Sequence, residues 1–310
     1  MHDVIVIGGG PAGLSAALVL GRCRRRVLLC DSGRYRNAAT QSMHGFLTRD
    51  GIHPAQVRQI AREQLKQYPV EILDMAVIDA RRDGDGFEVT LASGERLRCR
   101  KLLLATGLVD ELPELKGLKD FYGTSVFHCP YCDAWEVRDK PLGVFSNGAE
   151  GVKLSMTVRM WSDDVILFTN GPVELDKYAA EGLERLGIQV FQDRVDRLEG
   201  KDGVLERVVF EDGSSIPRRA LFLKTKQKQQ ADLAKKLRLP FSEEHGIEKG
   251  GKYEETYVKG VFVAGDASKD LLMAIVAAAE GAQAAFGINC ELQAEDQSVE
   301  MCRNRSEPLG

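Results

Sequence analysis

The sequence has 310 residues, 44% of them hydrophobic and 28% charged, and a formal net charge of −4 at pH 7. This length favours two domains, and a weak charge with both signs interspersed gives no electrostatic support to a nucleic-acid partner. No apolar run reaches the roughly 18 residues that a membrane helix needs, and a strand pattern begins almost at Met1, in place of a signal peptide. We therefore expect a cytoplasmic protein that contacts neither a membrane nor nucleic acid.

The chain opens with a predicted strand over residues 4–7, a helix over 13–21 and a second strand over 27–30. Two strands that are joined by a helix lie parallel to each other. The N-terminus is therefore expected to form a βαβ unit.

Between the first strand and the helix, Gly8, Gly10 and Gly13 form the motif G-x-G-x-x-G. The first glycine makes a tight turn, the second lets a pyrophosphate approach the backbone, and the third allows close packing of helix on strand. The pyrophosphate then lies at the helix N-terminus, where free N–H groups and the dipole favour an anion. Asp31 ends the second strand, where a carboxylate can accept from a ribose hydroxyl. The sequence predicts a dinucleotide site and leaves NAD and FAD as alternatives.

The middle of the chain repeats this pattern after a stretch of short strands. Residues 71–104 alternate β-like segments with glycine turns, and the acidic, proline-bearing segment 109–117 is typical of a linker. A second strand–turn–helix–strand pattern then covers residues 142–168, with its helix ending near residue 160. We expect a second unit of the same α/β kind here.

The last third of the chain returns to strand and helix. Residues 260–264 read as a strand, Gly265-Asp266 follows it, and an alanine-rich helix runs from about residue 271 to 286. The polar tail 291–310 is expected to fray.

The most specific feature is the pair Cys129-Pro130-Tyr131-Cys132. Two thiols at this spacing, at the start of a helical turn, can close a small disulfide, and such pairs often hold a thiol of depressed pKa. A dithiol carries two electrons, which matches the capacity of a flavin. The other five of the seven cysteines stand alone, and Cys30 follows an apolar run that predicts a buried side chain. The lone cysteines are Cys23, Cys30, Cys99, Cys290 and Cys302.

Two alternatives for the cysteine pair are a zinc site and an inert buried pair. A structural zinc needs about four ligands, but no second C-x-x-C is present and His128 is the nearest histidine, so we predict no metal site. Asp133 follows the pair directly, and its carboxyl group could exchange protons with a thiolate as the disulfide opens and closes. An acid that is merely favoured by the dipole at a helix start remains the alternative for Asp133.

Gly265-Asp266 resembles the second FAD motif of the two-dinucleotide-fold flavoproteins, and Thr106 and Gly107 match that family's Ala-Thr-Gly segment. The resemblance implies that the cofactor is FAD. It also implies that Asp266 binds the ribityl chain and that the helix beginning near Leu272-Met273 points its N-terminus at the flavin ring. An aspartate that only caps a helix after a strand is the alternative for Asp266.

FAD motifs at both ends, an inserted middle unit and C-x-x-C-D together resemble the bacterial-type thioredoxin reductases, up to about residue 287. The resemblance implies an α/β fold of two Rossmann-like domains, one inserted into the other. The boundaries expected are 1–113 with 246–310 for FAD, and 114–245 for the insert. It implies a homodimer whose partner is a thioredoxin-like protein or a small dithiol or disulfide. It further implies that Cys132 faces the flavin, that Cys129 reacts with the partner, and that Asp133 is the general acid.

The nicotinamide motifs of that family are altered here. The turn reads Ser146-Asn147-Gly148-Ala149-Glu150-Gly151, without the first glycine and with an acid near the expected phosphates. After the next strand, Thr169-Asn170-Gly171 replaces the His-Arg-Arg that clamps the 2′-phosphate of NADPH, so no fixed positive charge offsets that dianion. These changes disfavour efficient use of NADPH.

Several functions therefore stay open beside a flavin-linked disulfide oxidoreductase that works without NADPH. They are an NADPH-dependent thioredoxin reductase, a dithiol oxidase that passes electrons to oxygen, a ferredoxin-linked enzyme and a flavin-binding redox sensor. The family's diflavin-linked disulfide oxidoreductases offer a further possibility, a second FAD. Tyr131, Trp135 and Trp161 could stack on a second ring, although we expect them to pack in the core.

Overall fold

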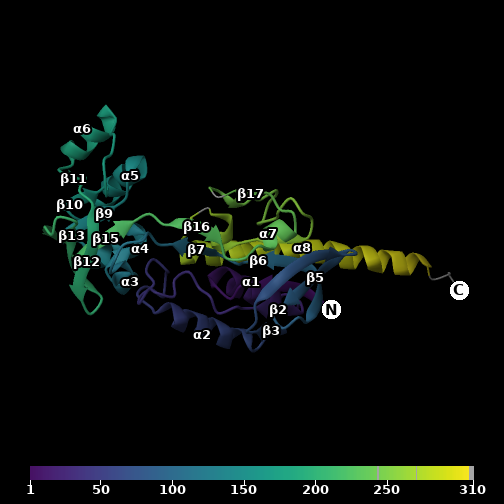
Figure 1. Ribbon diagram of the computed structural model, residues 1–310. Helices are drawn as coiled ribbons and strands as arrows, with labels where there is room; N and C mark the ends of the chain where they lie inside the picture. The colour runs from purple at the N-terminus through teal and green to yellow at the C-terminus, as the bar shows by residue number, and fades with distance from the viewer. Residues whose placement is uncertain (243, 270, 307–310) are drawn as a thin grey trace.

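The fold was obtained as a computed structural model that describes residues 1–242, 244–269 and 271–306, with side chains up to residue 298. Figure 1 shows two bodies, each a sheet covered by helices, that are joined by two extended segments. These segments, β7 (Leu108–Glu111) and β16 (Lys226–Gln229), pair antiparallel. The predicted α/β fold of two Rossmann-type domains is confirmed, and the predicted linker at 109–117 begins inside β7.

The larger body holds a seven-stranded sheet. The strand order is β3-β2-β1-β6-β5-β4, with β19 paired to the end of β6. Five of these strands are parallel, and the β4–β5 hairpin extends the sheet antiparallel from β6. The strands are β1 (His2–Ile7), β2 (Val27–Cys30), β3 (Val70–Leu73), β4 (Val77–Asp83), β5 (Gly86–Leu91), β6 (Arg96–Leu104) and β19 (Val261–Val263).

The smaller body holds five parallel strands in the order β11-β10-β9-β15-β8 and a separate antiparallel sheet, β12-β13-β14. The first sheet repeats the βαβ arrangement predicted for residues 142–168. The strands are β8 (Val126–Phe127), β9 (Leu142–Phe145), β10 (Val165–Phe168), β11 (Gln189–Phe191), β12 (Val195–Lys201), β13 (Val204–Phe210), β14 (Ser215–Pro217) and β15 (Ala220–Leu223). A short pair, β17 (Phe241–Ser242) and β18 (Gly246–Ile247), lies on the larger body.

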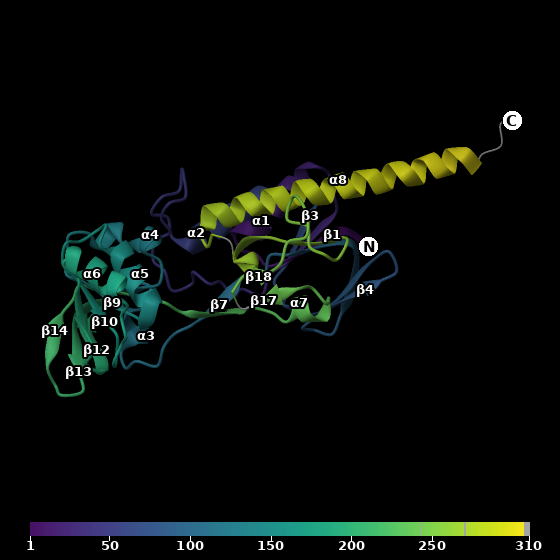
Figure 2. The same cartoon turned by 90° about the horizontal axis from the view of Figure 1, so that it is seen from above.

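Helices cover both sheets, and one of them is far longer than the sequence predicts. The helices are α1 (Pro11–Arg22), α2 (Pro54–Leu65), α3 (Leu118–Phe121), α4 (Pro130–Asp133), α5 (Gly148–Val158), α6 (Lys177–Arg185), α7 (Leu233–Lys236) and α8 (Ala274–Ser306), with 3-10 turns η1 (Trp135–Val137) and η2 (Gly265–Ser268). Figure 2 shows α8 running along the larger body and past its end. Helix α8 lies against α1 so closely that a Cβ on Gly281 would lie 2.0 Å from the carbonyl oxygen of Ala12.

The expectation that the tail frays after residue 290 is wrong for the residues described up to 306, because α8 continues through them. Buried Lys101 binds Glu291 and lies 2.6 Å from Glu295 Oε1, and Arg100 lies 2.8 Å from Asp296 Oδ1. These ion pairs fix a segment that composition alone marks as polar. Residues 307–310 and the side chain of Cys302 lie outside the described part of the chain.

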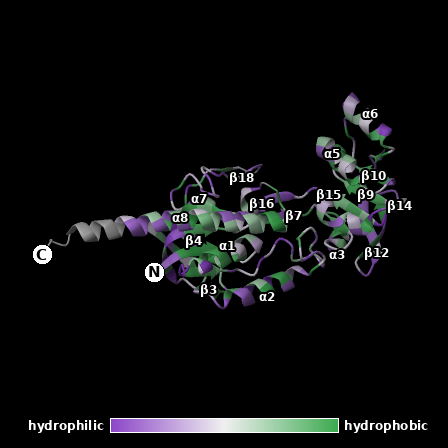
Figure 3. Ribbon diagram, turned by 180° about the vertical axis from the view of Figure 1, so that it is seen from behind, coloured by the Kyte–Doolittle hydropathy of each residue, from purple (hydrophilic) through white to green (hydrophobic). Residues whose placement is uncertain are grey.

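The cores explain why the predicted strands form where they do. Figure 3 shows apolar residues concentrated on the strands of both bodies, and β1, β2 and β15 are buried along nearly their whole length. Cys30 is buried as predicted. Leu233, Leu237 and Leu239 pack in the same core as Ile5 of the larger body. The boundaries at 113/114 and 245/246 stay a prediction, and this packing favours a return to the larger body nearer β16.

No helix in the part of the chain that the structure describes is both long and apolar enough to cross a membrane.

Candidate active site

A cavity of about 600 Å³ opens at the carboxyl ends of β1, β2 and β6, the edge where open parallel sheets bind ligands. Its volume is in the range of cofactor and small-molecule sites. The structure brings together in its lining ten of the twelve residues predicted to form the site: Gly8, Gly10, Asp31, Thr106, Gly107, Cys132, Asp133, Gly265, Asp266 and Met273. The other two adjoin lining residues, since Cys129 is bonded to Cys132 and Gly13 packs on Gly8.

The three motif glycines differ in what surrounds them. Gly8 has a φ of +115°, and a Cβ there would lie 2.2 Å from the carbonyl oxygen of Ala105. A Cβ on Gly13 would lie 1.9 Å from the carbonyl oxygen of Gly8, so this glycine lets α1 pack on the turn. A Cβ on Gly10 would meet nothing within 4 Å and would point into open space beside the cavity. The turn therefore keeps one position free for a ligand, as the second glycine of a dinucleotide motif requires.

Replacing Gly10 with valine should leave the protein folded and weaken FAD binding roughly 10- to 100-fold, because an added side chain overpacks the ligand and not the protein. Gly10 has φ −77° and ψ −177°, which valine adopts without strain. Gly13→Ala is the contrasting variant, since its methyl group collides with backbone and should lower the melting temperature. FAD content after gel filtration, measured beside melting, tests this pair. A folded Gly10→Val protein with full FAD would remove the assignment.

Asp31 is buried at the end of β2, and helix α2 supplies one of its partners. Its Oδ1 accepts from the Gly33 N–H at 3.0 Å, and its Oδ2 accepts from the Tyr35 hydroxyl at 2.6 Å and from Arg62 Nη2 at 2.7 Å. Burial alone would raise the pKa of Asp31, but these hydrogen bonds hold it below its ordinary value. The charged carboxylate keeps capacity on Oδ1 to accept from a ribose hydroxyl. Sequence reasoning missed Arg62 because it missed α2, although Pro54 at the first helical position signals that helix.

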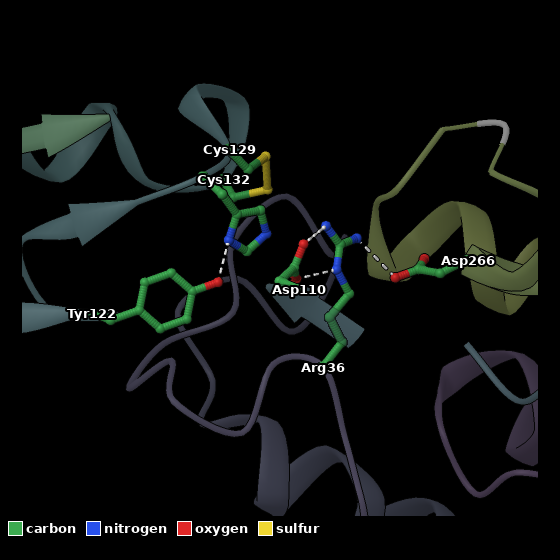
Figure 4. The surroundings of a disulfide bond; sticks show 7 residues. Arg36, Asp110, Tyr122, Cys129, Cys132 and Asp266 are labelled. Carbon is green, nitrogen blue, oxygen red and sulfur yellow. Dashed lines mark hydrogen bonds and ion pairs between the residues drawn. A yellow bond between two sulfur atoms is a disulfide. The ribbon is translucent and has the colours of Figure 1, made fainter. Parts of the chain in front are cut away.

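Arg36 lies between two aspartates from distant parts of the chain (Figure 4). Its Nε and Nη2 donate to the two oxygens of Asp110 at 2.6 and 3.1 Å, and its Nη1 donates to Asp266 Oδ2 at 2.9 Å. Asp110 also accepts from the Thr225 hydroxyl at 2.5 Å. Burial would raise the pKa of Asp110, but Arg36 holds it below the ordinary value. Arg36 therefore links Asp110 of β7 to Asp266, the aspartate expected to hold the cofactor.

Cys129 and Cys132 are joined by a disulfide around the short helix α4, as their spacing predicts. Both are half-buried, and of the two only Cys132 lines the cavity. His128 also lines it and lies 2.8 Å from the Tyr122 hydroxyl through Nδ1. Burial lowers the pKa of His128, and Arg36 lowers it further, which favours the neutral imidazole. Because Cys132 lines the cavity and Cys129 does not, the two sulfur atoms differ in their access to a bound cofactor.

Asp133 lines the cavity next to Cys132 and is half-buried. Burial raises the pKa of Asp133 to about 7, the nearby Glu136 raises it and His44 lowers it. A carboxyl group with this pKa exists in both protonation states near neutral pH, which suits a general acid–base group. The position of Asp133 beside Cys132 and this pKa are compatible with proton exchange, and its role as general acid stays a prediction.

The nicotinamide-type turn of the smaller body keeps part of the dinucleotide pattern. A Cβ on Gly151 would lie 2.7 Å from the Ser146 carbonyl oxygen, the same close packing that Gly13 provides. However, Asn147 caps α5 with its own side chain, accepting from the Gly148 N–H at 2.6 Å. The Asn170 side chain accepts from the Val195 N–H at 2.9 Å, so its oxygen is engaged in a hydrogen bond within the protein.

A groove of about 530 Å³ runs beside α5, and its lining carries Glu174 and Asp176 with Lys153 as the basic residue. Tyr131 reaches this groove and packs edge-on to Trp161, with ring centroids 5.7 Å apart. Trp161 packs against the core as expected, but Tyr131 and Trp135 are 66% and 62% exposed. The expectation of core packing is wrong for these two, because the short α4–η1 segment turns them outward. Within the described residues no three His, Cys, Asp or Glu side chains cluster as metal ligands would.

Comparison with known proteins agrees with this geometry. The family model for pyridine nucleotide-disulphide oxidoreductases matches residues 2–282. A protein of Arthroderma benhamiae named "Probable thioredoxin reductase" is 34% identical over 95% of this chain and 81% of its own. Thioredoxin reductase aclD of Aspergillus oryzae is 32% identical over 96% of this chain and 98% of its own. The crystal structure of an oxidoreductase from Agrobacterium tumefaciens superposes with a TM-score of 0.88 at 34% identity, covering 94% of this chain and 98% of that one.

Proposed function

Because the chain belongs to the pyridine nucleotide-disulphide oxidoreductase family, we propose that it moves two electrons between FAD and the Cys129–Cys132 pair. The observation that carries this proposal is the shared cavity: Cys132 lines the same space as Gly10 and Asp266. A disulfide that opens onto a dinucleotide site has a direct route for electrons. We therefore regard the chain as a thioredoxin-reductase-like flavoprotein whose substrate is a thiol or disulfide.

The residues present fit FAD as the bound group. The space beside Gly10 and the N-terminus of α1 would hold the diphosphate, and Asp31 would accept from the adenosine ribose. Asp266 and Met273, which directly precedes α8, would hold the ribityl and ring portion. Bound FAD supplies a two-electron acceptor or donor for the adjacent disulfide.

The chain's own part of the reaction is thiol–disulfide exchange. A substrate thiolate attacks Sγ of Cys129, the Cys129–Cys132 bond breaks, and Cys132 leaves as a thiolate. The second substrate thiolate then attacks the substrate sulfur of the mixed disulfide and releases Cys129, so that the substrate leaves oxidised and the pair is left reduced. Asp133 in its protonated form supplies a proton to a released thiolate. The reverse sequence would reduce a substrate disulfide.

We propose further that NADPH is a poor electron donor for this chain. The charges around α5 carry this part of the proposal, since Glu150 lies in its first turn and Glu174 and Asp176 line the adjacent groove. An NADPH-dependent thioredoxin reductase, a dithiol oxidase that uses oxygen and a redox sensor remain the alternatives. Turnover of a dithiol separates the enzymes from the sensor, and oxygen consumption during that turnover identifies the oxidase.

NADPH should reduce the flavin slowly and without saturation, whereas a dithiol should reduce it through the cysteine pair. A charge-assisted hydrogen bond contributes roughly 1.5–3 kcal/mol, so the loss of two arginine contacts weakens binding by some two to four powers of ten. Stopped-flow reduction with NADPH, NADH and dithiothreitol, followed at the flavin band, measures this. Rapid reduction by micromolar NADPH would contradict this proposal and would identify the chain as an NADPH-dependent thioredoxin reductase.

The partner and the assembly follow the family resemblance only and stay predictions. The partner expected is a thioredoxin-like protein or a small dithiol or disulfide, and the assembly expected is a homodimer. The cytoplasmic location, which is expected from the sequence pattern and not from the resemblance, also stays a prediction. A second FAD would show as close to two FAD per chain in a denatured extract, and one FAD per chain would exclude it.

A further inference from the structure

We propose that His44 is a positioning residue for the redox pair: together with Glu136 it sets the charge around Asp133, and it does so from the other body of the molecule. The inference rests on the proposed role of Asp133 as the proton donor. It adds a residue from the FAD-side body that acts through Asp133 without touching the sulfur atoms.

A closed loop holds His44 in place. The Met43 N–H donates to the Ile52 carbonyl at 2.8 Å, and the Gly51 N–H donates to the Met43 carbonyl at 2.9 Å. Asp50 braces the tip, accepting from the Gly45 N–H at 2.8 Å. His44 therefore projects from a loop that backbone hydrogen bonds fix at its base, between β2 and α2 of the larger body.

The ring of His44 faces carboxylates on both sides. Its Nδ1 lies 3.6 Å from Asp50 Oδ1 in its own loop, and its Nε2 lies 3.5 Å from Glu136 Oε1 in η1 of the smaller body. The His44 side chain is 20% exposed, and it lines the same cavity as Asp133. Glu136 is three residues beyond Asp133 in sequence. Three ionisable groups thus meet where the two bodies touch at the redox pair.

The two neighbours of Asp133 act on it in opposite directions. Apart from burial, Glu136 opposes ionisation of Asp133 because it is an anion, and protonated His44 favours ionisation because it is a cation. His44 and Glu136 also partly neutralise each other, so each moderates the effect of the other. Among the described residues, the ionisable groups that face this site are Asp50 on the His44 loop, Glu136 on η1 and Tyr122, whose pKa the charge of Asp133 raises.

Because His44 comes from the larger body, its effect on Asp133 depends on how the two bodies are placed. Asp133 and Glu136 belong to the smaller body, whereas His44 belongs to the larger one. Any movement that separates α4–η1 from the 43–52 loop takes the His44 ring away and leaves the carboxylate of Glu136 beside Asp133. Asp133 would then hold its proton more firmly, so its proton would be released most readily while Cys132 lines the cavity.

The rate at which dithiothreitol opens the disulfide tests the inference without relying on turnover. The protein with FAD bound is mixed with dithiothreitol anaerobically, quenched with iodoacetamide, and the labelled fraction is read by mass spectrometry. Divided by the thiolate concentration of dithiothreitol, the rate constant should fall as pH rises through about 7, where Asp133 loses its proton. Asp133→Asn should abolish that fall.

Each variant should move the pH at which the rate falls in a defined direction. His44→Gln removes a ring that can carry a positive charge and should move the fall to higher pH. His44→Arg places a permanent cation there and Glu136→Gln removes an anion, and both should move the fall to lower pH. Shifts of about 0.5 to 1 pH unit are expected for partly exposed charges. His245→Gln, an exposed histidine away from the cavity, is the matched control and should leave the profile unchanged.

Each outcome distinguishes the two proposals. A fall in rate that persists in Asp133→Asn overturns the role of Asp133 itself. A fall that disappears in Asp133→Asn but does not move in any His44 or Glu136 variant overturns only the inference about His44. Comparison of His44→Arg with His44→Gln controls for disturbance of the loop, since both lose the imidazole but only one keeps a positive charge.

Discussion

Replacement of Cys132 with serine should lower dithiol-driven flavin reduction by at least about a thousandfold, because no second thiolate remains to pass electrons onward. Replacement of Cys129 should be as severe for turnover but different in its spectrum. Cys129→Ser leaves a thiolate at Cys132, which lines the cavity, so a long-wavelength charge-transfer band with oxidised flavin should appear. Absorption spectra of both variants, titrated with pH, measure the difference.

The exposed free cysteine Cys290, which lies on α8, provides the control. Cys290→Ser should keep both the wild-type rate and the wild-type spectrum. A charge-transfer band in Cys132→Ser and none in Cys129→Ser would require the two roles to be exchanged. No band in either variant would mean that neither sulfur contacts the flavin.

Replacement of Arg36 with methionine should have the largest effect on stability. Methionine keeps much of the volume but leaves the carboxylates of Asp110 and Asp266 without their shared cation, and breaking a buried ion pair costs roughly 3–5 kcal/mol. The melting temperature should fall by roughly 6–15 °C, and FAD should be lost on gel filtration. Thermal melting with and without added FAD measures both effects.

Two further variants interpret the Arg36 result. Arg34→Met removes an exposed arginine two residues away, which also lines the cavity, and should change melting of the FAD-free protein little. Asp110→Asn keeps a hydrogen-bond acceptor for Arg36, so this variant should lose less stability than Arg36→Met. Asp110 does not line the cavity, so the variant alters the ion pair without changing the cavity wall. A normal melting temperature and full FAD in Arg36→Met would mean that the arginine is not needed to hold Asp266.

The sequence predicts the features that depend on local pattern. The turn at Gly8–Gly13 follows from a strand, fixed glycine spacing and a helix, and the disulfide follows from the spacing of Cys129 and Cys132. The same holds for the repeated βαβ unit, because continuous apolar runs fix buried parallel strands. The edge of a parallel sheet then gathers the strand-end residues into one cavity.

What the sequence does not predict depends on contacts between distant segments. Arg36, Asp110 and Asp266 are neighbours only in the folded chain. No sequence motif around any one of them predicts contact with the other two. His44 meets Glu136 only because the two bodies pack together at the redox pair. The length of α8 depends on Lys101 and Arg100 of β6, so a tail that looks polar and free is held by charges from another strand.

The central claim is that electrons enter or leave the flavin through the Cys129–Cys132 pair. An anaerobic titration with dithiothreitol, followed at the absorption band of oxidised flavin, tests it most directly in the wild type and in the Cys129→Ser/Cys132→Ser double variant. The account predicts that the wild-type flavin is bleached and that the double variant, with the same FAD content, stays oxidised. Bleaching of both proteins at the same rate would contradict it.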